Sequence, residues 1–144
     1  MKIITTFILL SVFWGANIQA QGLEIEVPNT WTATESGIAK GTSELSIGSI
    51  VEFEGLSLAE YLNKIANLPP SIEGYEIAQV AEIKESDYVV SILRDLTKGE
   101  NTARSHFFIC KDGRNKHRLL ELFTENVLHV IAGGKAAIGF CAQQ

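Results

Sequence analysis

Four strand-like segments in the middle of the chain narrow the possible folds more than any other feature. They are residues 75–84, 88–95, 105–111 and 116–123. The last two flank Asp112-Gly113, and an Asp-Gly pair tolerates the positive φ angles of a hairpin turn. Residues 96–103, which include Gly, Asn and Thr, are expected to form a loop. Strands joined by short connections pair with their neighbours in the chain, so we predict an antiparallel meander.

A first helix is predicted before these strands. Ser57 and Glu60 have the spacing of a capping box, in which the Ser hydroxyl accepts from the Glu amide and the carboxylate accepts from the Ser amide. The apolar residues that follow share one helical face: Leu58, Tyr61, Leu62 and Ile65. Pro69-Pro70 cannot donate helical hydrogen bonds. We therefore predict a helix over residues 58–67.

A second helix is predicted at the end of the chain, over residues 125–141. Five residues recur there at helical spacing: Val127, Ile131, Gly134, Ile138 and Cys141. The pair Gly133-Gly134 weakens a helix by about 1 kcal/mol per glycine, which suggests a kink or close packing against the sheet.

The remaining patterns complete an α+β fold. Residues 23–27 alternate apolar and polar side chains, and residues 38–53 are rich in β-branched residues, so both are expected to be strands. We predict an antiparallel meander sheet covered by two helices, as a two-layer or α/β/α sandwich. A length of 144 residues supports one such domain, over residues 21–144.

The order of these elements over residues 22–141, with the local motif Pro28-x-x-Trp31, resembles the PsbP/Mog1-like α/β sandwich family. Members of this family serve unrelated purposes that include photosystem assembly, nuclear transport and roles in the cell envelope. The resemblance therefore implies an architecture and transfers no functional residue.

The N-terminus has the layout of a secretory signal peptide. Met1-Lys2 is followed by the uncharged apolar residues 3–16 and a short polar stretch that ends at Ala20. We predict cleavage after Ala20 and a periplasmic or secreted protein with no later membrane span; an uncleaved anchor is the alternative. No cysteine follows the expected cleavage point directly, which disfavours a lipoprotein.

Cys110 and Cys141 are the two cysteines of the chain. An even count in an oxidising compartment favours a disulfide between them, which would tie the last helix to a strand. Two buried thiols or half of a metal site are the alternatives. The chain contains no Cys-x-x-Cys motif, so we expect no metal and no cofactor.

Charge is divided unequally along the chain. The net charge is −5, and an isoelectric point near 5.2 argues against a nucleic-acid binder. Residues 21–87 carry −9 and residues 88–144 carry +3. A basic patch is expected on the predicted hairpin, from Arg104, Lys111, Arg114, Lys116 and Arg118. Such a patch could bind an anionic ligand, or it could solubilise an exposed sheet edge.

His106 and Glu121 are the candidate catalytic residues. If Lys111 faces Lys116 in the hairpin, His106 lies opposite Glu121, and a His–carboxylate pair can act as a general base. A register slip of one residue would separate them onto opposite faces. A plain cross-strand polar pair is the alternative, since no partnered nucleophile is evident in the sequence.

The sequence contains none of the common hydrolase, metalloprotease or nucleotide-binding motifs. We therefore expect an exported domain that binds another envelope protein, of the inhibitor or immunity type in its sharpest form. One alternative is a small hydrolase or transferase that uses His106 and Glu121. Another is a carrier of an apolar molecule, in a pocket lined by Leu62, Ile65, Phe108 and Ile138.

Overall fold

The computed structural model describes residues 17–20, 23–52, 57–111 and 116–143. Its main feature is a seven-stranded sheet in which every neighbouring pair is antiparallel. The strand order is β3 (Thr32–Ala33), β4 (Gly37–Lys40), β5 (Ser43–Glu52), β9 (Lys116–Thr124), β8 (Asn101–Lys111), β7 (Val89–Lys98) and β6 (Glu76–Glu85). Helices α1 (Leu58–Ala66) and α2 (Leu128–Cys141) complete the α+β fold, as predicted.

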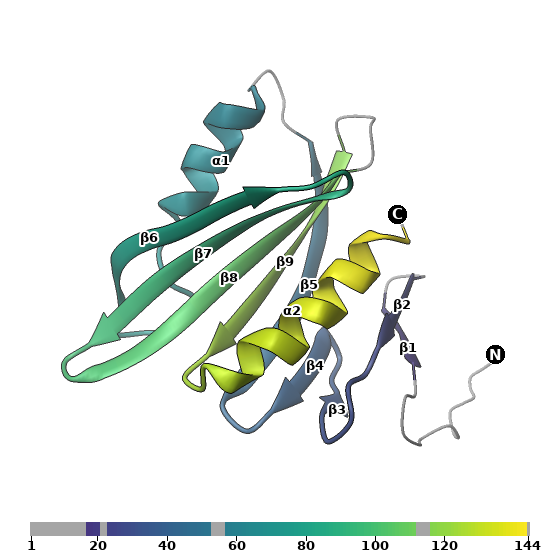
Figure 1. The fold of residues 1–144 in the computed structure, drawn as a ribbon, viewed down its shortest axis with the longest axis horizontal. Coiled ribbons are helices and arrows are strands. Elements are labelled where there is room, and N and C mark those ends of the chain that lie inside the picture. Colours follow the sequence, from purple (N-terminus) through teal and green to yellow (C-terminus); the bar gives the residue numbers. More distant parts are fainter. Residues whose placement is uncertain (1–16, 21–22, 53–56, 112–115, 144) are drawn as a thin grey trace.

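The two helices pack on opposite faces of the sheet (Figure 1). Side chains of β8 alternate between the faces: Phe107 and Ile109 pack with α1, whereas Phe108 and Cys110 pack with α2. The period of two along a strand produces this division. We call these two surfaces the α1 face and the α2 face. The structure therefore has the α/β/α arrangement, with one helix on each face of the sheet, and not the two-layer one.

Helix α1 begins and ends as its sequence indicates. The Ser57 hydroxyl accepts a hydrogen bond from the Glu60 amide at 3.2 Å, and the Glu60 carboxylate accepts one from the Ser57 amide at 2.9 Å. The bond from the Ser57 amide lowers the pKa of Glu60, since it favours the charged carboxylate. Tyr61 and Ile65 are buried against the sheet. The capping box and the apolar face of this helix are confirmed.

Two predicted boundaries are wrong. Residues 96–103 are not a loop, because β7 continues to Lys98 and β8 begins at Asn101, with Gly99 in the connection at a φ of 63°. That conformation suits glycine, which has no Cβ to clash. The terminal helix begins at Leu128 and not at residue 125, because Thr124 hydrogen-bonds the backbone of Asn126 and closes a turn first.

A separate two-stranded sheet joins β1 (Asn17–Ala20) to β2 (Leu23–Glu26). Within it Ile25 is fully buried in the same cluster as α2. Residues 1–16 of the predicted signal peptide lie outside the described residues, and its last four residues form β1. Cleavage after Ala20 would remove β1 and leave the seven-stranded sheet with all of its strands.

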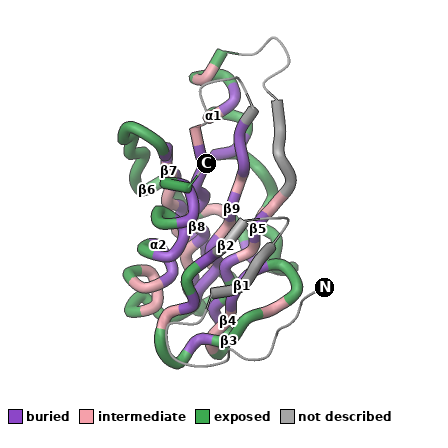
Figure 2. Tube along the Cα trace, turned by 90° about the vertical axis from the view of Figure 1, so that its right-hand side faces the viewer, coloured by how far each residue is buried: buried purple, intermediate pink, exposed green. Residues whose placement is uncertain are grey.

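Burial is concentrated in the central strands and decreases toward the sheet edge at β6 and along the outside of α2 (Figure 2). The aromatic side chains of Trp31, Phe108 and Phe140 are buried. Within the described ranges, no helix has the length and apolar character needed to cross a bilayer.

Candidate functional site

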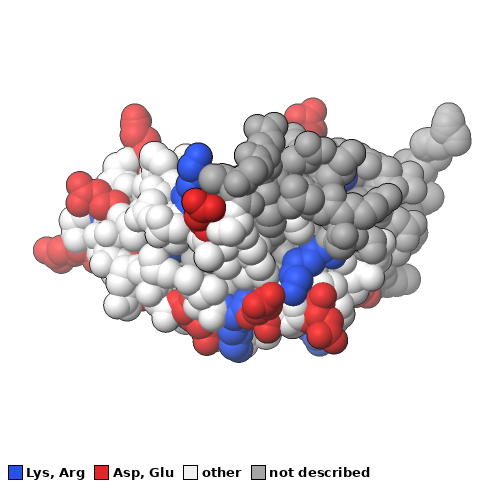
Figure 3. Space-filling model, turned by 90° about the horizontal axis from the view of Figure 1, so that it is seen from above, with Lys and Arg blue, Asp and Glu red and all other residues white. Residues whose placement is uncertain are grey.

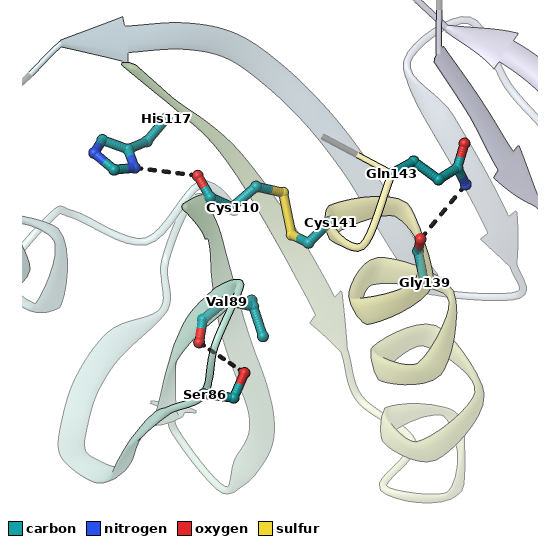
Figure 4. The surroundings of a disulfide bond; sticks show 7 residues. All are labelled: Ser86, Val89, Cys110, His117, Gly139, Cys141 and Gln143. Carbon is teal, nitrogen blue, oxygen red and sulfur yellow. Dashed lines mark hydrogen bonds between the residues drawn. A yellow bond between two sulfur atoms is a disulfide. The ribbon is translucent and has the colours of Figure 1, made fainter. Parts of the chain in front are cut away.

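A disulfide fixes the C-terminal end of α2 to the sheet. The Cys110 and Cys141 sulfur atoms are 2.08 Å apart, and the Cα atoms are 4.8 Å apart (Figure 4). Both residues are buried. The carbonyl of Cys110 also lies 3.1 Å from Nδ1 of His117 on the neighbouring strand. The predicted pairing is confirmed, and it excludes the alternatives of two free thiols or a metal site at these cysteines.

Small residues form most of the surface of α2 that packs on the sheet, and the buried Phe140 and Cys141 complete it at the C-terminal end of the helix. The small residues are Gly133, Gly134, Ala136 and Ala137. A Cβ on Gly133 would lie 2.8 Å from Cδ2 of Leu122, which is closer than packed atoms tolerate, and one on Gly134 would contact Phe108 at 3.6 Å. The absence of side chains thus lets the helix approach the sheet closely. The close packing predicted at this glycine pair is confirmed.

Large aliphatic side chains lie on the opposite side of α2. Leu128 is 72% exposed, Ile131 is 73% exposed and Ile138 is 41% exposed. At 100° per residue these positions share an arc of about 100° with Lys135 and Gly139. We call these five residues the outer face of α2. Val127, just before the helix, is exposed as well.

This distribution differs from the sequence analysis, where Val127, Ile131, Gly134, Ile138 and Cys141 formed one stripe. The stripe exists, but it lies at the border between the buried and exposed sides: Gly134 and Cys141 are buried, and the three aliphatic residues are not. The helical spacing of the apolar residues predicts the stripe, but it does not indicate which side of the stripe packs on the sheet. The run of small residues beside the stripe is the sequence feature that could have indicated the packed side of the helix.

A buried chain of hydrogen bonds holds the start of α2. The Thr124 hydroxyl donates to the Asn126 carbonyl at 2.9 Å, so it accepts from Ser43 Oγ at 2.5 Å. Ser43 in turn accepts from His129 Nδ1 at 2.6 Å, so this ring nitrogen carries a hydrogen. Ser43 is only 1% exposed. This Ser–His contact is therefore inaccessible to a substrate and anchors the helix.

A shallow groove of about 670 Å³ lies on the α2 face between the start of α2 and strands β6 to β8. Its lining includes Gln79, Asp95, Arg104 and Val127. The polar groups at its floor are already paired: Arg104 Nε lies 3.3 Å from an Asp95 oxygen, and Gln79 donates to the other oxygen at 2.7 Å. The groove therefore offers a ligand little unpaired charge.

The predicted pairing of His106 with Glu121 is wrong. In the observed register Lys111 faces His117, so His106 lies opposite Leu122 and Glu121 lies opposite Phe107. This slip of one residue places His106 on the α2 face and Glu121 on the α1 face. The hairpin turn, residues 112–115, lies outside the described residues. The proposed acid–base pair therefore does not form.

His106 is instead held against an aromatic ring. Its ring centroid lies 4.2 Å from that of Phe108, and its Nδ1 atom is buried without a hydrogen-bond partner among the described residues. Burial, aided by the cations of Arg104 and Lys84, lowers the pKa of His106 to about 4. A histidine with so low a pKa is a poor general base near neutrality.

Glu121 takes part in a polar network on the α1 face. Its carboxylate accepts hydrogen bonds from Ser71 and Ser105, both at 3.1 Å. Ser105 also lies 3.4 Å from the Arg94 guanidinium, which is fully buried and donates to the carbonyls of Ala66 and Leu68. Burial lowers the pKa of Arg94, and the charge of Glu121 opposes that shift. This network connects the end of α1 to the sheet, and the Ser105 hydroxyl that contacts Glu121 is fully buried.

The predicted basic patch is dispersed in the part that the structure describes. Arg104 and Lys111 lie seven residues apart on β8, about 23 Å along the strand, and point to opposite faces. Arg104 pairs with Asp95, and Lys111 pairs with Glu85 at 2.9 Å. Arg118 is buried and donates to the Gly48 carbonyl at 3.2 Å.

The other two predicted members of the patch, Arg114 and the side chain of Lys116, lie outside the described residues. On the surface view of Figure 3, Lys and Arg side chains lie among Asp and Glu side chains. An anionic ligand of the hairpin therefore gains no support from the described residues.

The predicted lining of an apolar pocket is also divided between the faces. Leu62 and Ile65 belong to α1 and lie on the α1 face of the sheet. Phe108 packs with α2 on the other face, and Ile138 is exposed. These residues cannot line one pocket, so the carrier hypothesis loses the site on which it depended.

Comparisons with known proteins identify no family. Neither a scan against protein-family models nor a search of curated proteins found a match. Membership of the PsbP/Mog1-like family stays a prediction. Among the described residues, no group of three or more His, Cys, Asp or Glu side chains is placed to hold a metal ion. The outer face of α2 is the surface that best qualifies as a functional site.

Proposed function

We propose that the protein is an exported domain that acts by binding another protein of its compartment and not by catalysis. The outer face of α2 carries this proposal. Leu128 and Ile131 are each more than 70% exposed on a helix that the Cys110–Cys141 bond fixes to the sheet. Exposed contiguous apolar surface favours association, because a partner removes it from water.

Two features support export. Disulfides form and persist in oxidising compartments, and both cysteines of this chain are paired. The sequence of residues 1–20 has the charged, apolar and small-residue order of a signal peptide. Both features support the proposal of a periplasmic or extracellular location.

Cell fractionation combined with crosslinking tests the proposal. The full chain, tagged after Gln144, is produced in its native organism, fractionated and treated with a cleavable amine crosslinker. We expect it outside the cytosol, lighter by residues 1–20, with one identified protein recovered in near-equal amount. Ile131→Glu should reduce that recovery. Ile83→Glu is the matched control, because Ile83 is also exposed but lies on β6.

Cytosolic protein with two reactive thiols would contradict export. Failure to recover a protein partner with the unaltered chain would contradict binding.

A further inference from the structure

We propose that the outer face of α2 binds an amphipathic helix of another exported protein, and that this helix carries a carboxylate for Lys135. The inference rests on the proposed function and names the partner's chemistry. It follows from three observations on α2: an exposed aliphatic ridge, a lysine within that ridge that has no carboxylate partner among the described residues, and a glycine that packing against the described residues does not explain.

The ridge has the dimensions of a helix–helix contact. Leu128, Ile131 and Ile138 follow one another at helical spacing, and the ten helical steps from 128 to 138 correspond to about 15 Å of helix. A partner helix of about three turns would cover this length, with its own apolar side chains at spacings of three and four.

Lys135 sets the charge of the partner. It is exposed between Ile131 and Ile138, and among the described residues no carboxylate lies within ion-pair distance of it. Helix α2 itself contains no acidic residue. A cation surrounded by apolar contacts is stabilised when a carboxylate is supplied from the other side of the interface.

The same charge disfavours two other occupants. A second copy packed antiparallel across this face would bring two Lys135 ammonium groups close together, with no carboxylate from either α2. An anionic membrane would attract a cluster of basic residues, whereas this chain has a net charge of −5 and its outer face has one lysine. A separate protein with an acidic, apolar helix satisfies both the ridge and the cation.

Gly139 supplies the third observation. Gly133 and Gly134 are explained by their contacts with Leu122 and Phe108, but a Cβ on Gly139 would meet no atom of the described residues within 4 Å. Glycine in a helix interior is unfavourable compared with almost every other residue. A partner that approaches the backbone closely at this position would account for it.

Site-specific crosslinking in the native organism tests the proposal on the full chain. A photoreactive benzoylphenylalanine replaces Ile138, with Ile83 replaced in a parallel control, and the adducts are sequenced by mass spectrometry. We expect an adduct at position 138 to an amphipathic segment that contains Asp or Glu. An adduct to lipid, to a second copy or to a segment without a carboxylate would overturn the inference.

The control separates the two proposals. An adduct at position 83 without one at position 138 would overturn the inference while the proposed binding function stands. No adduct to protein at either position would count against both.

Affinities then test each contact with a synthetic peptide of the crosslinked segment. Ile131→Glu should weaken binding about 30-fold or more, and Ile83→Glu should not change it. Lys135→Glu should weaken binding about tenfold, and reversing the peptide's carboxylate to lysine should restore it. Gly139→Gln should weaken binding although it raises the melting temperature, since the position is open and glutamine favours helix. Equal affinity for all of these variants would overturn the inference.

Discussion

Helices α1 and α2 cover opposite faces of one sheet, and they distribute their side chains in opposite ways. Helix α1 buries Tyr61 and Ile65 and exposes polar residues, which is the usual pattern for a helix at a protein surface. Helix α2 buries two glycines, two alanines, Phe140 and Cys141, and it exposes Leu128 and Ile131. The first arrangement stabilises the fold by itself. The second leaves apolar area exposed and depends on other contacts to hold the helix in place.

The largest expected effect is the loss of the disulfide. In the double variant Cys110→Ala/Cys141→Ala, the unfolding free energy should fall by about 4 kcal/mol, as estimated for a closed loop with a separation of 31 residues. Hydrogen exchange should show α2 amides losing protection before those of α1. Equal loss of protection in both helices would contradict the view that α2 depends on its covalent attachment.

A matched pair of truncations compares the two helices directly. Ile65→Ala on α1 should cost about 3 kcal/mol, because it removes a buried side chain and leaves a cavity. Ile131→Ala on α2 should change the unfolding free energy by no more than about 0.5 kcal/mol, since that side chain is 73% exposed. Urea denaturation of both variants gives the two values. A cost for Ile131→Ala as large as that for Ile65→Ala would show that the outer face belongs to the core.

This contrast also explains what the sequence could predict. Helix α1 was located almost to the residue because its signals are local: Ser57 and Glu60 cap it, and Pro69 limits its extent. The orientation of α2 depends on which of its sides fits against Leu122 and Phe108, and this is a tertiary property. The predicted hairpin register was wrong for a related reason. A shift of one residue between β8 and β9 decides whether His106 and Glu121 lie on the same face of the sheet.

Acid should destabilise the α2 face through His106. The folded-state pKa of His106, about 4, lies below its ordinary value of 6.5, so the unfolded chain binds a proton first as the pH falls. Stability is therefore lost between about pH 6.5 and 4, by about 2 kcal/mol. The variant His106→Gln should lose less over this range. Urea denaturation at pH 7 and pH 4.5 measures the difference, and identical pH dependence in both proteins would contradict it.

The smallest expected effect concerns how each helix begins. Ser57→Ala removes a local cap and should cost about 1 kcal/mol. A peptide of residues 55–70 should also lose helical circular dichroism on this change, because the cap lies within it. Helix α2 has no side-chain cap at Val127. Its start is held by Asn126, whose Oδ1 accepts from the Leu128 amide at 3.0 Å, and by Ser43, which contacts His129 across 86 positions of the sequence. Ser43→Ala should therefore reduce exchange protection at the start of α2 in the protein, whereas a peptide of residues 124–143 contains no Ser43 and should show little helix to begin with. Substantial helicity in that peptide would mean that α2, like α1, is specified by its own sequence.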